Sequence, residues 1–195
     1  MRIAERDTFL ATVSTHRQTV LAAIGANVCN GWKADIASCS WFSHPEGMQG
    51  SPALQAATRF LSVVWDGDRP NDETLLAALD RLIAAYHITP DGEVSDPDVD
   101  APRQEGASLF AEVAARFPEY GCYPVADPAK TMDDALMMAD AIDDLADLTL
   151  DMREVVWTAE HLSIDDAHFA FRLLFFHWGQ HARELSLYLC SRLWG

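Results

Sequence analysis

The feature that most constrains the fold is a long segment without helix breakers. No glycine or proline occurs between Thr131 and Asp166. Thr131 is a suitable N-cap, and Asp134 stands in the turn that would follow it, so a long helix is predicted to begin near residue 131. Apolar residues recur through the segment at the three- and four-residue intervals of one helix face. They are Ala135, Met138, Ala139, Ile142, Leu145, Ala146, Met152, Val155, Val156 and Ala159.

A second long helix is predicted directly after the first. Ser163 is a suitable N-cap, and Asp165 and Asp166 in the following turn complement the helix dipole. Because only a few residues separate the two helices, they should pack as antiparallel neighbours. The apolar side of the second helix is Phe171, Leu174, Phe175, Trp178, Ala182, Leu185, Leu189 and Leu193.

Shorter helices are predicted upstream of this hairpin. Ser51 and Asn71 are N-caps, and Pro90 and Pro118 end the helices that precede them. The predicted fold class is therefore all-α, a single helical bundle over residues 51–195 with a long C-terminal antiparallel helical hairpin and at most two short strands. We expect the core to contain Leu79, Ile142, Leu145, Phe175, Trp178 and Leu185.

Residues 1–50 differ from the rest of the chain. Apolar residues between positions 3 and 24 are consistent with one weak amphipathic helix, which Asn30-Gly31 would end. Residues 32–50 show no periodicity, so we interpret residues 1–50 as an N-terminal extension that is poorly ordered or holds one weak helix. One hypothesis is that the natural start is Met48, and peptides from before Met48 in the native protein would contradict it.

Charge and composition restrict the possible partners. The chain has 30 acidic and 14 basic residues and a net charge of −16. Nucleic acids and anionic membranes require a basic face, so we expect neither as a partner. A basic protein surface, a metal cation or a cationic small molecule fits the charge better. No apolar run approaches the roughly 20 residues that span a bilayer, and the four cysteines form no CxxC pair. We therefore expect a cytoplasmic protein with reduced thiols.

The first candidate site is a series of aspartates in the first long helix. Asp143, Asp144, Asp147 and Asp151 fall within an arc of roughly 100° on a helical wheel, opposite the apolar residues. Their DDxxD pattern is similar to the magnesium and diphosphate motif of all-helical prenyl-transferring enzymes. However, the chain has no second such motif and only two lysines. A solvated acidic face is the favoured interpretation, and a site for a cation or a basic partner is the alternative.

The second candidate site is a histidine pair in the second long helix. His177 and His181 project from one side of a helix, and Glu184 continues their line. Two imidazoles and a carboxylate so placed could bind a divalent metal such as zinc or iron, with further ligands from a neighbouring helix. The alternative is a pair of histidines hydrogen-bonded to that neighbour. Trp178 is a candidate binding residue whose apolar position favours the core, and Gly179 indicates a close helix approach or room for a ligand.

The two candidate sites are predicted to lie at the same level along the axis of the helical hairpin. Residues equally distant from the turn of an antiparallel hairpin lie level with each other. Counted from Leu162, Asp147 and His177 are each 15 residues away, and Asp143 and His181 are each 19 residues away. A shared site would require the histidines to lie within about 8 Å of these carboxylates, the reach of a common small ion.

These motifs resemble an uncharacterised bacterial family known only as a domain of unknown function. The family has a DDLADI-like helix start and an HWGxH-like final helix, which residues 143–148 and 176–181 match. Asp151-Met152, Leu185 and the aromatic and proline loop at 123–128 add to the resemblance, while Leu148-Thr149 departs from it. The resemblance covers about residues 54–193 and implies an all-helical fold. It implies no activity and therefore no catalytic residue.

Two classes of function are consistent with these features. The first is a non-catalytic binding or assembly module that docks a basic partner on its acidic helix face. The second is a metal-dependent hydrolase with His177 and His181 as ligands and a neighbouring carboxylate as base or third ligand. The sequence has no nucleophile motif and no phosphate-binding glycine loop. The module is the favoured interpretation, and metal content would discriminate between the two.

Overall fold

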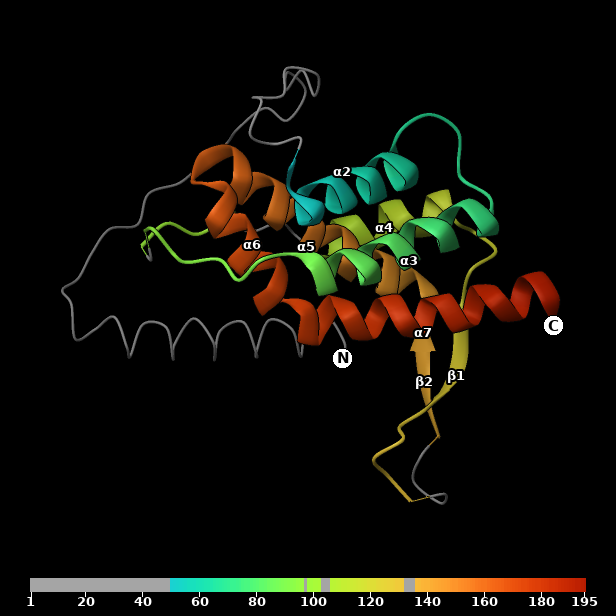
Figure 1. Cartoon of the computed structure of the whole chain (residues 1–195). Helices are drawn as coiled ribbons and strands as arrows, with labels where there is room; N and C mark the ends of the chain where they lie inside the picture. Colours follow the sequence, from blue (N-terminus) through green and yellow to red (C-terminus); the bar gives the residue numbers. More distant parts are fainter. Residues whose placement is uncertain (1–49, 97, 103–105, 132–135) are drawn as a thin grey trace.

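The computed structural model describes residues 50–96, 98–102, 106–131 and 136–195, which form a set of packed helices with one small hairpin (Figure 1). The predictions for residues 1–49, including the weak helix and the Met48 start, lie outside the described residues. The elements are α2 (Pro52–Trp65), α3 (Asp72–Ile88), α4 (Gly106–Arg116), β1 (Cys122–Ala126), β2 (Leu136–Asp140), α5 (Ala141–His161), α6 (Ile164–Leu173) and α7 (Phe175–Trp194). The predicted all-α class is confirmed.

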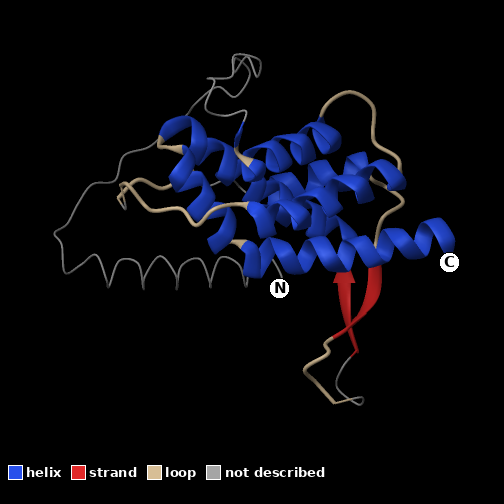
Figure 2. Ribbon diagram, in the orientation of Figure 1, coloured by secondary structure: helices blue, strands red, loops and turns tan. Residues whose placement is uncertain are grey.

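Helix α5 lies at the centre of this arrangement, with α2, α4, α6 and α7 packed against it (Figure 2). Of its 21 residues, 14 are buried. A helix covered on several sides buries polar residues together with apolar ones, so the aspartates of α5 also face other helices. None of the described helices combines the length and the apolar character needed to cross a membrane.

The predicted helix starts at three caps are confirmed. The side chain of Ser51 accepts a hydrogen bond from the backbone N–H of Leu54, and Ser163 accepts one from Asp166. Asn71 caps α3 in the same way, at 2.8 Å from the N–H of Thr74. Each bond satisfies a backbone donor that has no partner within its own helix.

The long helix predicted to begin near Thr131 begins later, and the helix predicted over residues 136–140 is wrong. These residues form β2, which pairs antiparallel with β1 so that Tyr123 lies opposite Ala139. Helix α5 begins only at Ala141, where the side chain of Asp140 caps it by accepting the N–H of Ile142 at 2.9 Å. Pairing with residues 122–126 overrides a spacing that suits a helix equally well.

The second long helix is divided into α6 and α7. Leu174 separates them, and its carbonyl accepts hydrogen bonds from the N–H groups of both His177 and Trp178. A carbonyl shared between two N–H groups in this way is common at a helix terminus, and the chain changes direction between α6 and α7 (Figure 1). The hairpin therefore consists of α5, a short α6 and the 20-residue α7.

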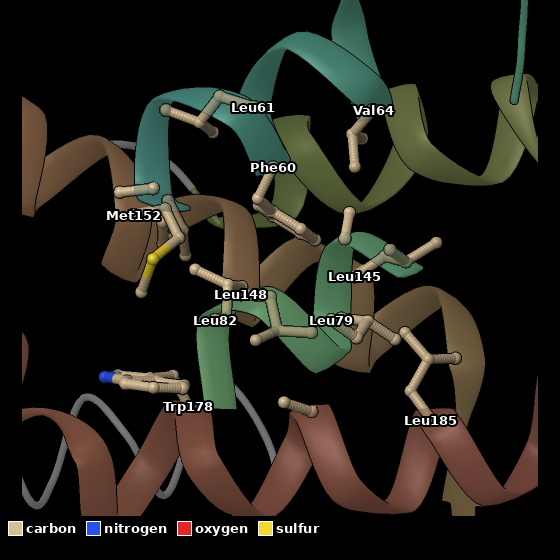
Figure 3. Close-up of a cluster of buried hydrophobic side chains, with 14 of the residues drawn as sticks. Phe60, Leu61, Val64, Leu79, Leu82, Leu145, Leu148, Met152, Trp178 and Leu185 are labelled. Carbon is tan, nitrogen blue, oxygen red and sulfur yellow. The ribbon is translucent and has the colours of Figure 1, made fainter. Parts of the chain in front are cut away.

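The core lies between α2, α3, α5 and α7 (Figure 3), and five of the six predicted core residues are buried in it. Leu79, Leu145 and Leu185 are fully buried, as is Trp178, whose indole N–H donates to the carbonyl of Phe171 at 2.8 Å. Ile142 is also buried. The sixth predicted core residue, Phe175, is only partly buried and packs against the edge of this core.

An aromatic ring packed beside Gly179 leaves no room for a side chain at this position. The ring of Phe175, one turn earlier in α7, stacks on Tyr86 of α3 with centroids 3.4 Å apart. A Cβ atom at Gly179 would come within 2.7 Å of this ring. The close approach of a neighbouring helix predicted for Gly179 is therefore wrong: the nearest atoms belong to Phe175 and Arg183 of the same helix.

Candidate metal centre

Helix α5 contributes three buried carboxylates to one site. Asp144, Asp147 and Asp151 follow each other at intervals of three and four residues, which places them on one side of the helix. Their exposed fractions are 2%, 0% and 0%. The predicted solvated acidic face is therefore wrong for these three residues, because α7 covers that side of α5. Asp143, at the edge of the same side, is half-buried.

Helix α7 contributes two buried imidazoles. His177 and His181 lie one helical turn apart, each with an exposed fraction of 3%. Their rings are 4.7 Å apart between centroids and nearly perpendicular, at 73°. Both rings point from α7 towards the aspartates of α5. The apolar periodicity of the sequence did not show that these two histidines are buried.

Each imidazole is held by one carboxylate and directed at another. Nδ1 of His177 lies 2.6 Å from Oδ2 of Asp151, and Nδ1 of His181 lies 2.7 Å from Oδ1 of Asp144. The opposite ring nitrogens converge on Asp147: Nε2 of His177 is 3.5 Å from its Oδ2, and Nε2 of His181 is 3.4 Å away. Among the described residues, the two carboxylate oxygens of Asp147 have no hydrogen-bond partner. The Nε2 atom of His177 has none among them either.

The charges of the buried carboxylates change the pKa values of neighbouring groups in the cluster. Burial by itself would lower the pKa of His177, but the carboxylates of Asp147 and Asp151 outweigh it and raise that pKa to about 9. Burial, followed by the nearby charge of Asp147, raises the pKa of Asp143 to about 6. The buried carboxylates therefore strongly favour positive charge between them.

The geometry suits a small metal ion. One ligand atom from each of Asp147, His177 and His181 lies within 4.8 Å of the other two. Two ligands at tetrahedral positions, each about 2.05 Å from an ion, stand about 3.3 Å apart. This matches the 3.4 and 3.5 Å between Asp147 and the two Nε2 atoms. Carboxylates on the opposite ring nitrogens, as Asp144 and Asp151 provide here, are the usual second layer of histidine ligands.

The structure brings together some of the predicted site residues and leaves others apart. His177 and His181 meet the aspartates of α5, and Asp147 rather than Glu184 completes the three-residue group. Glu184 is half-buried and accepts a hydrogen bond from the amide of Gln180 at 2.9 Å. Trp178 lies in the core.

One member of the site had no signal of its own in the sequence. The hydroxyl of Tyr123 in β1 donates to Oδ2 of Asp144 at 2.5 Å, and both residues are buried. In the sequence Tyr123 stands in an aromatic and proline-rich segment without periodicity, which we expected to be a loop and which forms β1 instead. Long-range strand pairing places it at the site.

These features define a helical protein with an enclosed cluster of histidine and aspartate. No protein-family model and no curated protein matches the chain. The fold is similar to a crystal structure of protein BF1032 from Bacteroides fragilis, with a TM-score of 0.53 and 14% sequence identity. The similarity covers 73% of this chain and 93% of that chain, and at this identity it shows the fold alone.

Proposed function

We propose that the protein binds one divalent transition-metal ion between α5 and α7, with Asp147, His177 and His181 as its ligands. The observation that carries this proposal is the convergence of two oriented imidazoles on one buried carboxylate that has no hydrogen-bond partner among the described residues. Asp144 and Asp151 would hold the two rings in the orientation that presents Nε2 to the ion.

Distances within the cluster support an ion rather than a network of protons alone. The Nδ1 atoms of His177 and His181 lie 2.6 and 2.7 Å from their carboxylates, as in charge-assisted hydrogen bonds. The Nε2 atoms lie 3.4 and 3.5 Å from Asp147, beyond the usual 2.7–3.2 Å of an N–H···O bond. A buried carboxylate without partners is costly, and a cation between these groups would offset that cost.

The ligand atoms favour particular metals. Two imidazole nitrogens and one carboxylate oxygen suit zinc or ferrous iron. Calcium and magnesium prefer sites composed of oxygen alone, with six or more ligands. The proposed ion is therefore zinc or ferrous iron.

A metal-dependent hydrolase is the second candidate function, and the number of protein ligands favours it. Structural zinc sites generally have four protein ligands, whereas catalytic sites have three and leave one position for water. An ion in this site would supply an activated water and a Lewis acid. The docking module on an acidic face, which the sequence favoured, loses its main support, because Asp144, Asp147 and Asp151 are buried.

Metal content tests the proposal directly. The full chain is purified without a histidine tag, exposed to zinc or to ferrous iron under anaerobic conditions, desalted and analysed by elemental mass spectrometry. We expect about one ion per chain, because the described residues contain one group of three such ligands. His177→Ala and His181→Ala should lose the ion while retaining a helical circular dichroism spectrum.

His161→Ala is the matched control. His161 is the last residue of α5, outside the cluster; it is exposed and its Nδ1 contacts the carbonyl of Trp157. This variant should retain the ion. A wild-type chain that binds neither metal at micromolar concentration would refute the proposal.

A further inference from the structure

The β1–β2 hairpin projects from the helical bundle (Figure 1). Val125 and Ala139 are partly buried and pack against the core, and Tyr123 inserts more deeply. Leu136 and Met138 of β2 are 75% and 67% exposed. Tyr123 is the only residue of the two strands that is buried. Its ring stacks on Tyr188 of α7, with centroids 4.7 Å apart and an angle of 27°.

Tyr123 begins a chain of contacts that ends at the proposed ligands. Its hydroxyl donates to Oδ2 of Asp144 at 2.5 Å, and Oδ1 of the same carboxylate lies 2.7 Å from Nδ1 of His181. The other nitrogen of His181 faces Asp147 at 3.4 Å. Because one carboxylate receives both hydrogen bonds, the orientation that Tyr123 gives to Asp144 also fixes the plane of the His181 ring.

The tyrosine is well suited to this role. Burial, followed by the charge of Asp144, raises the pKa of Tyr123, so its hydroxyl remains protonated and continues to donate. Asp144 is 2% exposed, so little water is present to replace a lost donor. Without the hydroxyl, the carboxylate would be free to rotate away from His181.

We propose that Tyr123 is a positioning residue of the metal centre, which holds Asp144 and His181 in ligand geometry and couples the hairpin to the bound ion. This inference rests on the proposed metal binding. Coupling is reciprocal, so an ion that requires an ordered His181 must in turn stabilise the docked hairpin. The hairpin should therefore be held more tightly in the metal-bound protein.

The test compares Tyr123→Phe with Tyr120→Phe and uses Co²⁺ as the probe, because its absorption bands report ligand geometry. Tyr120 is a close control: it is buried, it donates to Asp72 at 2.7 Å and its ring also packs on Tyr188. Tyr123→Phe should weaken Co²⁺ binding by about 10- to 100-fold, the usual cost of losing an outer partner. At saturating Co²⁺ its absorption bands should also differ from those of the wild type. Tyr120→Phe should leave both the affinity and the bands unchanged.

The possible outcomes separate this inference from the proposed function. If the wild type binds neither Co²⁺ nor Zn²⁺, both proposals fail. If the wild type binds and Tyr123→Phe binds equally well with the same spectrum, only the role of Tyr123 is overturned. Equal weakening by Tyr120→Phe would attribute the effect to general destabilisation and would also overturn it.

Hydrogen exchange provides a second measurement that needs no variant. Exchange of the β1 amides, those of Cys122, Tyr123, Val125 and Ala126, should slow in the full-length wild type when Zn²⁺ is added, because the docked hairpin and the bound ion stabilise each other. Unchanged exchange in these residues at saturating Zn²⁺ would contradict the coupling.

Discussion

His181 and Asp144 are 37 residues apart in the sequence and share a buried hydrogen bond of 2.7 Å between Nδ1 and Oδ1. The bond joins α7 to α5, the central helix, at the site where Asp147 faces both histidines. Polar contacts of this kind within a core are costly unless they are satisfied, so their arrangement has consequences for stability as well as for binding.

Bound metal should stabilise the folded chain. A ligand present at 100 times its dissociation constant adds about 2.7 kcal/mol to the free energy of unfolding. For a chain of this size, that corresponds to a rise of about 5–10 °C in the midpoint of thermal unfolding. Calorimetry with Zn²⁺ and with a chelator measures the difference.

Asp147→Asn is the informative variant for this measurement, because it replaces the shared carboxylate with an amide of equal size. Its unfolding midpoint should no longer respond to Zn²⁺. Asp165→Asn, at a side chain that is 74% exposed, should respond as the wild type does. A full response in Asp147→Asn would exclude Asp147 as a ligand.

The metal-free protein should lose stability as the pH rises from about 6.5 to above 9. The pKa of His177 is about 9 in the folded state and about 6.5 in an unfolded chain. A group that binds its proton more tightly when folded stabilises the fold at pH values below the unfolded pKa. That stabilisation disappears as the pH rises through the folded value. Denaturant unfolding in the presence of a chelator, measured across this range, would show the decline.

The control for this pH dependence is His177→Gln, which should flatten the curve between pH 6.5 and 9. The raised pKa of Asp143 acts only up to about pH 6, below this window. His161→Ala should retain the decline of the wild type. A wild-type free energy of unfolding that stays constant from pH 6.5 to 9 would contradict the positive charge inferred for His177.

Trp178→Ala should reduce the free energy of unfolding by about 3–5 kcal/mol, since it removes a fully buried indole and leaves a cavity. The lost indole N–H would also leave the carbonyl of Phe171 without this donor. Chemical denaturation measures the change. Trp194→Ala provides the comparison, because that side chain is 72% exposed and its loss should cost no more than about 0.5 kcal/mol.

Gly179→Ala should destabilise the protein, although alanine is the better helix former. The added Cβ would come within 2.7 Å of the Phe175 ring, which is stacked on Tyr86. Displacing the ring should cost about 1–3 kcal/mol, more than the gain of about 1 kcal/mol in helix propensity. Adding Phe175→Leu should remove most of this penalty. A Gly179→Ala variant more stable than the wild type would contradict the packing described for this ring.

Local signals predicted much of the fold. The caps at Ser51, Asn71 and Ser163 depend on a few neighbouring residues, and the sequence identifies them correctly. The strand at residues 136–140 depends on pairing with residues 122–126, beyond the reach of a helical period, so a helical spacing concealed it. The break between α6 and α7 at Leu174 involves neither glycine nor proline, so the sequence contains no helix-breaking residue that would predict it.

The site was only partly predictable for a similar reason. The spacing of His177 and His181 and their height relative to the aspartates follow from helix geometry, and the structure brings these groups together. Periodicity assigns aspartates to the solvent side of a helix, because it contains no information about a covering helix. It therefore could not show that Asp147 is buried, or that it replaces Glu184 beside the two imidazoles.

The break at Leu174 also makes α7 a helix of its own, and both imidazoles of the cluster belong to it. The facing carboxylates of Asp144, Asp147 and Asp151 all belong to a different helix, α5. The packing of these two helices on each other therefore sets all four histidine–aspartate distances of the cluster at once.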